Sequence, residues 1–210
     1  MDGISFLGAR RVVEVYRRLY YFPIMQTRPA QPADLDHLID LDATIEATDY
    51  LHLELSGEGL AVSWRLEERP LREKRIDANA MTEEQRFAIK QIVTGVEDGI
   101  ALAVEYGGHL MALAAGRTDA ENNTLQVVDL RVDYEYRRQG LGSALLYQLI
   151  HHAREARMRA VTATTLTNNL PAARFLAKGG FDLAGVNTHL HSNHDLVKEA
   201  VSLFWYAAFD

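Results

Sequence analysis

The strongest chemical signal in the sequence is the run Arg137-Arg138-Gln139-Gly140-Leu141-Gly142-Ser143. It separates a predicted strand that ends at Val132 from a predicted helix that begins at Ser143. A glycine-rich loop at the start of a helix directs unpaired backbone N–H groups and the positive end of the helix dipole to one point. Because glycine lets a ligand approach the backbone closely, this run predicts a phosphate-binding loop.

Two common phosphate-binding loops do not fit this run. In a Walker loop a Lys stands between the last glycine and Ser or Thr, whereas here Gly142 is followed directly by Ser143. A dinucleotide-binding fingerprint needs a third small residue where Leu145 stands, and an acid about 20 residues later. The predicted strand over 161–167 contains no acid. The sequence therefore excludes the first loop and disfavours the second.

The run instead resembles the Arg/Gln-x-x-Gly-x-Gly/Ala pyrophosphate loop of the GNAT superfamily of acyl-CoA N-acyltransferases. A second block, 168–181, resembles the superfamily's Asn-x-x-Ala helix that ends in Lys-x-Gly-Phe. The resemblance implies the GNAT acyl-CoA N-acyltransferase fold, an α+β domain in three α/β/α layers with a mixed, mostly antiparallel central sheet. Within the superfamily, residues 125–181 and the ending 203–206 are most similar to streptothricin acetyltransferases.

This resemblance implies that acetyl-CoA is the co-substrate, and it suggests which residues bind it. Backbone groups of Leu130 and Val132 would pair with the pantetheine arm, and Asn169 would bond that arm, cap the helix that Pro171 opens, or do both. One of the loop's two arginines would add a charge-assisted contact to the pyrophosphate. The alternative for both arginines is a solvated loop position. The pyrophosphate loop would consist of Arg137, Arg138, Gln139, Gly140, Leu141, Gly142 and Ser143.

Acetyl transfer to an amine requires that the amine lose a proton. An alkylammonium has a pKa near 10.4, so its deprotonation at pH 7 costs about 4.6 kcal/mol. Asp129 lies in the predicted strand that would hold the thioester, and strand alternation directs it away from the side of Leu130 and Val132. It is the candidate catalytic base or ammonium anchor. Pairing with Arg131 or with a neighbouring strand is its structural alternative.

The departing CoA thiolate needs a proton, which many GNAT enzymes supply from a Tyr at the position of Leu176 in this chain. This departure from the family pattern leaves Tyr206 as the candidate catalytic acid, with Tyr134 and Tyr136 as alternatives. A CoA thiol is also acidic enough to leave into water without a dedicated acid. No metal is expected, because the three histidines over 189–194 lack the helical spacing or acid partners of a metal site.

Composition restricts the partners. The 22 Lys and Arg against 29 Asp and Glu give a net charge of −7, and no basic stripe stands out. A nucleic-acid partner is therefore not expected, whereas a small cationic amine is. The 210-residue chain is 48% hydrophobic, which fits a packed globular domain. With no cysteine it has no disulfides, and we expect a cytoplasmic location.

The chain divides into two predicted parts. Residues 1–23 form an amphipathic helical extension, in which four arginines prevent any apolar run long enough to span a membrane, so no membrane partner is expected. Residues 24–210 form the GNAT N-acetyltransferase domain. Its predicted elements are a strand over 24–30, a helix from 32 to 45, a hairpin over 51–66 that turns at 56–59 and has 60–66 as its second strand, a helix opened by a Thr82/Gln85 capping box, a hairpin over 100–116 that turns at Gly107-Gly108, a strand over 125–132, a helix from 143, a strand over 161–167, a helix over 171–178 and a strand over 202–209.

Three functions compete on these observations. The first is an acetyl-CoA-dependent N-acetyltransferase of a primary amine on a small, streptothricin-like or polyamine-like substrate. The second is a protein lysine or N-terminal acetyltransferase, which needs an open groove. The third is a non-catalytic acyl-CoA-binding module, which the missing Tyr at Leu176 keeps open. The sequence also leaves a homodimer open.

Overall fold

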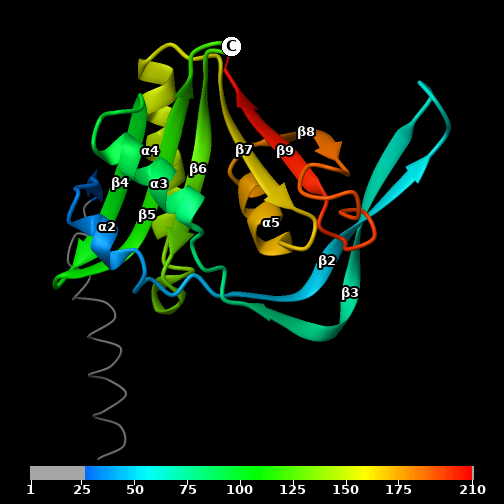
Figure 1. Ribbon diagram of the computed structural model, residues 1–210, viewed down its shortest axis with the longest axis horizontal. Helices are drawn as coiled ribbons and strands as arrows, with labels where there is room; N and C mark the ends of the chain where they lie inside the picture. Colours follow the sequence, from blue (N-terminus) through cyan, green and yellow to red (C-terminus); the bar gives the residue numbers. More distant parts are fainter. Residues whose placement is uncertain (1–26, 210) are drawn as a thin grey trace, which may run out of the picture.

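The computed structural model describes residues 27–209 of the chain (Figure 1). The predicted helical extension over 1–23 lies outside this part. The described elements are β1 (Thr27–Pro29), α2 (Asp34–His37), β2 (Ile45–Ser56), β3 (Ser63–Asp77), α3 (Glu83–Val93), β4 (Gly99–Tyr106), β5 (His109–Asp119), β6 (Thr124–Val132), η1 (Tyr134–Tyr136), α4 (Leu141–Glu155), β7 (Ala160–Leu166), α5 (Leu170–Lys178), β8 (Asp182–Asn187) and β9 (Ser202–Ala208).

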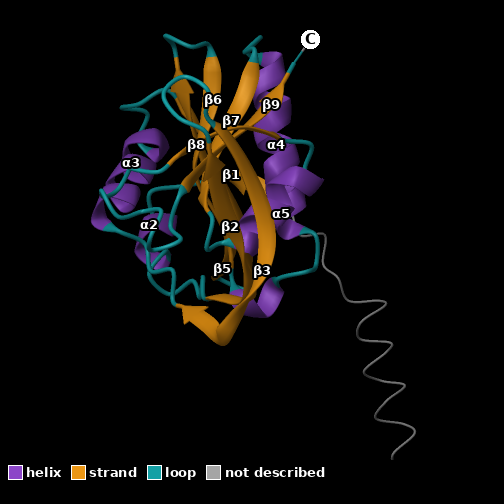
Figure 2. Cartoon of the chain, turned by 90° about the vertical axis from the view of Figure 1, so that its right-hand side faces the viewer, coloured by secondary structure: helices purple, strands orange, loops and turns teal. Residues whose placement is uncertain are grey.

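A seven-stranded sheet in the order β1-β4-β5-β6-β7-β9-β8 forms the centre of the domain. Its strands pair antiparallel except for β6 and β7, which are parallel. Helices cover both faces, with α2 and α3 on one and α4 and α5 on the other (Figure 2). The predicted α+β class, its three layers and its mostly antiparallel mixed sheet are confirmed.

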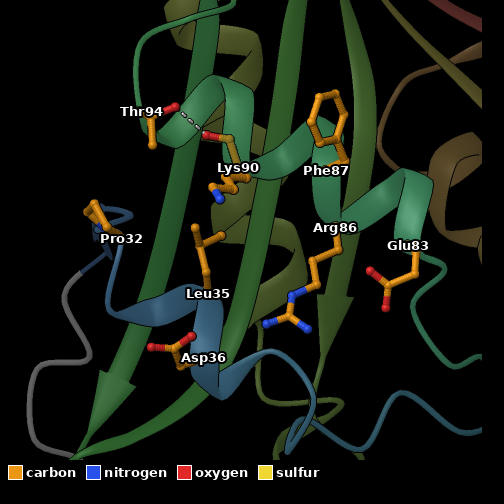
Figure 3. A pocket seen from close by; sticks show the side chains of 8 residues that line it. All are labelled: Pro32, Leu35, Asp36, Glu83, Arg86, Phe87, Lys90 and Thr94. Carbon is orange, nitrogen blue, oxygen red and sulfur yellow. Dashed lines mark hydrogen bonds between the residues drawn. The ribbon is translucent and has the colours of Figure 1, made fainter.

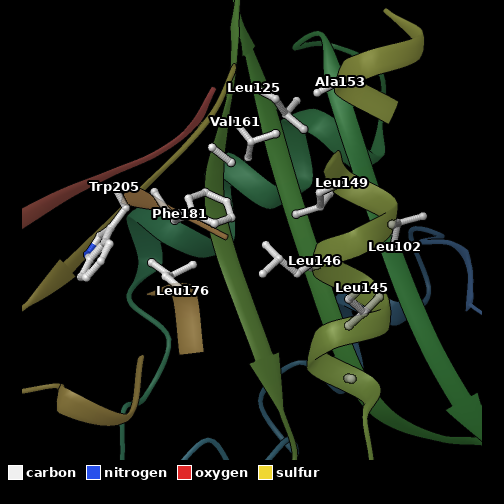
Figure 4. Packing of buried hydrophobic residues seen from close by; sticks show 14 of the residues in the cluster. Leu102, Leu125, Leu145, Leu146, Leu149, Ala153, Val161, Leu176, Phe181 and Trp205 are labelled. Carbon is white, nitrogen blue, oxygen red and sulfur yellow. The ribbon is translucent and has the colours of Figure 1, made fainter. Parts of the chain in front are cut away.

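Alternate residues of the central strands supply two hydrophobic cores. On β4, Leu102 and Val104 pack toward α4, whereas Ala101 and Ala103 pack toward α2 and α3. The apolar stripe of α4 lies directly on the sheet, where Leu145 and Leu149 are fully buried (Figure 4). This packing fixes the position of α4, and with it the position of the loop that precedes the helix.

The strands β6 and β7 separate soon after they begin. Their parallel register runs only from Thr124 opposite Ala160 to Gln126 opposite Thr162. A bulge at Val128 on β6 then interrupts its pairing with β5 and bends the strand. The two strands diverge toward their C-terminal ends (Figure 1). Beyond Gln126, β6 therefore has a backbone edge that no neighbouring strand covers.

The β2–β3 hairpin forms a second, two-stranded sheet. Its turn lies at the predicted place, but its strands extend well beyond 51–66 and pair from Ile45 opposite Asp77 to Ser56 opposite Ser63. Leu60 and Val62, expected in the second strand, lie in the exposed turn. The hairpin passes below the ends of β6 and β7 (Figure 1).

The other predicted elements agree with the structure, with two exceptions. The Thr82 capping box and the turn at Gly107-Gly108, where both glycines have positive φ angles of 62° and 82°, are present as expected. The predicted helix over 32–45 is wrong: α2 ends at His37, and Ile45 begins β2. Leucines at helical spacing are still buried there, because irregular turns place them in the core. The strand β8 has no counterpart among the predicted elements.

Within residues 27–209, no helix is long and apolar enough to cross a membrane.

Packing of α4 on the sheet gives a first test. Leu149 is 0% exposed, so Leu149→Ala leaves a cavity and is expected to lower the free energy of unfolding by about 2–5 kcal/mol. Tyr147 on the same helix is 69% exposed, and Tyr147→Ala is expected to change it by about 0.5 kcal/mol. Urea denaturation of both variants measures the difference. Equal effects would contradict the described packing of α4.

Candidate active site

Where β6 and β7 diverge beyond Gln126 and Thr162, they leave an opening between them. The uncovered edge of β6 presents backbone N–H and C=O groups to this opening. The Asp133 N–H donates to the Met111 carbonyl at 2.9 Å. In an antiparallel pair the amide groups of alternate residues face the partner strand, so those of Arg131 face β5. Those of Leu130 and Val132 then face the opening beside β7. An extended chain lying there can pair with them as an added strand would.

The glycine loop ends on an uncapped helix. Gly140, whose φ of 91° requires a residue without a Cβ, is the N-cap of α4, and no side chain caps this helix. The first backbone bond of the helix runs from the Ala144 N–H to the Gly140 carbonyl, 2.9 Å. The N–H groups of residues 141–143 therefore have no partner within the helix. Leu141 is 7% exposed and anchors the turn in the core. The turn can take an anion.

Arg137 has a structural role that the sequence did not reveal. Its Nε donates to the Val132 carbonyl at 3.0 Å, and its Nη1 donates to the Thr44 carbonyl. The guanidinium also lies over the Tyr134 ring, 5.3 Å from the centroid. These contacts tie the loop to the end of β6 and to the start of β2. Arg138 is exposed and is therefore the better placed of the two arginines for a phosphate.

The remaining loop residues and Asn169 lie around the same opening. Gln139 donates from Nε2 to the Glu135 carbonyl at 3.3 Å, and Ser143 is exposed in the first turn of α4. Asn169 caps α5 by accepting a hydrogen bond from the Ala172 N–H at 3.2 Å. The capping alternative for Asn169 is therefore observed, and it leaves the side-chain amide nitrogen for a ligand.

Asp129 forms a buried ion pair with Arg131. The Arg131 Nε lies 2.5 Å from Asp129 Oδ2, and their side chains are 3% and 10% exposed, in that order. Burial raises the pKa of Asp129, and the hydrogen bond from Arg131 opposes that rise. Asp129 lies on the face of β6 away from Leu130 and Val132, which pack into the core under α4. The structural alternative, pairing with Arg131, is thus observed.

The structure separates Tyr206 from the other predicted site residues. Tyr206 on β9 is paired with Thr162. Thr162 is near the start of β7, where β6 and β7 are still hydrogen-bonded. Its ring lies beneath Arg159, 6.0 Å from the guanidinium. Leu176 is 6% exposed in the core and supplies no acid. Both alternative acids lie in η1 beside the loop. Tyr134 is exposed and interacts with Glu46 and Arg137, whereas Tyr136 packs against the core under α4.

The β2 strand crosses the mouth of the opening, which the sequence did not predict. The Tyr134 N–H donates to the Asp42 carbonyl at 2.8 Å, just before β2 begins, and the Leu51 N–H donates to the Thr167 carbonyl at 2.9 Å. One end of the crossing is therefore attached to the end of β6 and the other to the end of β7. Residues 46–50 lie between these attachments.

Other candidate sites lie apart from this opening. A cleft of about 420 Å³ between α2 and α3 has the side chains of Glu83, Arg86 and Phe87 on its α3 wall (Figure 3). This cleft lies on the other face of the sheet from the N-terminus of α4, so it is separate from the proposed phosphate-binding loop. In the part of the chain from 27 to 209, no cluster of three His, Cys, Asp or Glu side chains could hold a metal ion.

Comparison with known proteins agrees with this geometry. The model of the Acetyltransferase (GNAT) family matches residues 62–181. Streptothricin acetyltransferase A of Bacillus subtilis (strain 168) is 34% identical over 88 residues, 42% of this chain and 50% of that protein. An Escherichia coli streptothricin acetyltransferase is 25% identical over 40% of this chain and 49% of its own length. The chain thus spans about half the length of the curated relatives it matches.

Solved structures show the same fold. A Bacillus anthracis protein assigned as a streptothricin acetyltransferase, in complex with acetyl coenzyme A, has a TM-score of 0.69 at 22% identity, covering 90% of this chain and 100% of that one. A nourseothricin acetyltransferase has a TM-score of 0.70 at 20% identity, covering 87% of this chain and 97% of that one. At these identities the likeness establishes the fold.

A bulky side chain at Gly142 tests the loop. A Cβ there would lie 3.5 Å from the Phe175 ring and from the Val132 side chain, an ordinary contact, and the family motif accepts alanine at this position. Gly142→Val adds two further methyl groups, which obstruct a ligand on the N–H groups. We expect the dissociation constant for CoA, measured by calorimetry, to rise at least tenfold, about 1.4 kcal/mol.

Gly185→Val is the matched control, because a Cβ at Gly185 meets nothing within 4 Å and β8 lies away from the loop. It should keep the affinity of the unmodified protein, and so should Gly142→Ala, since the motif accepts alanine there. A folded Gly142→Val variant with unchanged affinity would refute the loop assignment.

Proposed function

Because the chain belongs to the acetyltransferase (GNAT) family, we propose that it transfers the acetyl group of acetyl-CoA to a primary amine of a small cationic substrate. The observation that carries this proposal is the uncovered edge of β6 beside the uncapped N-terminus of α4. Such an opening offers backbone groups to an extended arm and N–H groups to a pyrophosphate. A cytoplasmic location, which the absence of cysteine permits, is part of the proposal.

The residues around the opening fit acetyl-CoA. Leu130 and Val132 would pair with the pantetheine arm, and Val132 would do so mainly through its N–H, since its carbonyl already accepts from Arg137. Residues 140–143 would hold the pyrophosphate, with Arg138 as the added cation. The Asn169 amide nitrogen would donate to the arm. The acetyl group would then emerge on the face of the sheet where Asp129 projects.

Charge and the crossing strand support the proposed substrate class. The chain carries a net charge of −7, which attracts a cationic acceptor. The β2 strand, attached at both ends of the opening, narrows the mouth and disfavours an extended peptide. The curated relatives are named for streptothricin, so an amine on a streptothricin-like molecule is the specific acceptor we propose. We keep polyamines as the second small-amine class.

A thiol-release assay with acetyl-CoA tests this proposal. We expect CoA release with streptothricin-type and polyamine amines to exceed release with lysine-containing peptides and with water by at least tenfold in kcat/KM, about 1.4 kcal/mol in transition-state binding. Faster release with peptides would favour a protein acetyltransferase. CoA binding without release above the rate in water would favour a non-catalytic acyl-CoA-binding module.

The role of Asp129 is tested with its partner. Asp129→Asn leaves a buried, unpaired Arg131 and is expected to cost about 3–5 kcal/mol in the free energy of unfolding. The double variant Asp129→Asn/Arg131→Gln removes both charges and should recover most of that stability. If Asp129 is a base or an ammonium anchor, the double variant stays at least tenfold below the unmodified protein in kcat/KM. Recovery of both stability and kcat/KM would leave Asp129 a purely structural residue.

A further inference from the structure

A cluster of three polar side chains lies beside the opening but is not part of the predicted site. Tyr50 and His52 come from β2, on either side of the residue that is bonded to Thr167, and Glu199 comes from the segment before β9. Leu51 packs into the core under α4 and α5. Strand alternation therefore turns Tyr50 and His52 away from that core.

The charged hairpin side chains near His52 pair with one another, whereas Glu199, from outside the hairpin, has no such partner among the described residues. Arg65 lies 2.9 Å from Glu54 and 2.7 Å from Glu67, and Arg69 lies 2.7 and 3.0 Å from the same two carboxylates. These four side chains form a closed network. Within residues 27–209, no lysine or arginine pairs with Glu199; its only ion-pair partner is a histidine.

Glu199 is held in a conformation that non-glycine residues rarely adopt. Its φ is 54°, in the left-handed region. The Thr167 hydroxyl donates to the Glu199 carbonyl at 2.7 Å, and the Val201 N–H donates to the Thr167 hydroxyl at 3.0 Å. Thr167, directly after β7, thus fixes the backbone of Glu199. The position of the Glu199 side chain relative to β7 is therefore set by the fold.

The two aromatic residues contact the Glu199 carboxylate. His52 Nδ1 lies 3.5 Å from Glu199 Oε1, and this nitrogen is fully buried without a hydrogen-bond partner in the described structure. The His52 side chain is nonetheless 28% exposed, so the exposed part of the ring is its other edge. A hydrogen bond to Glu199 raises the pKa of Tyr50, whose ring lies edge-on to His52 at 6.2 Å.

We propose that His52 is the proton acceptor of the acetyl transfer, with Glu199 and Tyr50 as its positioning residues. His52 Nε2 takes a proton from the acceptor ammonium, directly or through one water. Glu199, whose Oε1 lies 3.5 Å from Nδ1, stabilises the imidazolium that forms, and Tyr50 holds the carboxylate in place. This inference rests on the proposed function, and it supplies a base that the buried Asp129–Arg131 pair is poorly placed to provide.

Each acetyl transfer removes two protons from the acceptor nitrogen. The ammonium gives one proton to His52, and the neutral amine nitrogen forms a bond to the acetyl carbon. The carbon–sulfur bond breaks, and its electron pair leaves with the CoA sulfur. The second proton lost by the nitrogen neutralises that thiolate, and the imidazolium returns its proton to water. Amide, CoA thiol and one released proton are the products.

The pH profile of kcat/KM tests this proposal with the full chain, acetyl-CoA and the best amine of the panel. Protonated histidine cannot accept a proton, so the unmodified protein should lose activity as the pH falls. His52→Gln should lower kcat/KM at neutral pH by at least about tenfold, and its residual rate should rise with pH as free amine appears. The groups facing His52 are Tyr50, Glu54, Glu67, Arg69 and Glu199; the His52→Gln variant keeps all of them.

Two further measurements separate proton transfer from packing. Added imidazole should restore activity to His52→Ala, which a structural role does not predict. Glu199→Gln, outside the hairpin, should lower kcat/KM and shift the acid limb of the profile even if the His52 variants fold poorly. His151→Gln on α4, whose side chain is 59% exposed, should behave as the unmodified protein.

The outcomes are distinguishable. A folded His52→Gln variant with an unchanged rate and acid limb overturns the role of His52 while the proposed function stands. An unmodified protein that acetylates no amine overturns the proposed function, and this inference with it. A lowered His52→Gln rate that climbs across the whole pH range with the free amine, together with imidazole rescue of His52→Ala, supports both.

Discussion

The opening between β6 and β7 depends on unsatisfied backbone hydrogen bonding. Once the strands part after Gln126 and Thr162, β6 exposes N–H and C=O groups that would otherwise pair with a neighbouring strand. The sheet cannot close over them, because the bulge at Val128 bends β6 and α5 packs beside β7 with its own cap at Asn169. The opening is therefore built into the fold, and a ligand with an extended arm completes the hydrogen bonding.

The opening is held by few contacts, and most involve β2. Arg137 joins the end of β6 to the Thr44 carbonyl, and Leu51 joins β2 to the end of β7. The hairpin thus ties together the two strand ends that the sheet leaves apart. The same strand carries Tyr50 and His52. Under the proposed function, support of the opening and choice of the acceptor amine are coupled in this one segment.

The sequence predicts those parts of the domain that local patterns determine. The stripe of α4, the capping box at Thr82 and the glycine turn at 107–108 each depend on residues close in sequence, and each is confirmed. The helix predicted over 32–45 is wrong, because buried leucines at helical spacing also occur in a chain of turns. The crossing of β2 depends on contacts with residues more than 90 positions away, and no local pattern encodes it.

The same distinction applies to the individual site residues. Gly140 is predictable because a glycine-rich run directly before a helix marks a phosphate loop, and its φ of 91° agrees with glycine there. Arg137 looks like a ligand group in the sequence, yet the distant Thr44 carbonyl is its partner. The partner of Asp129, Arg131, is two residues away and is among the alternatives that the sequence offers. Glu199 carries no sequence signal at all, since an isolated acid in a long segment is unremarkable. The Thr167 hydroxyl fixes the left-handed backbone of Glu199 and so its approach to His52. Because this contact joins residues 32 positions apart, the residue types in the sequence do not reveal that Glu199 and His52 lie together.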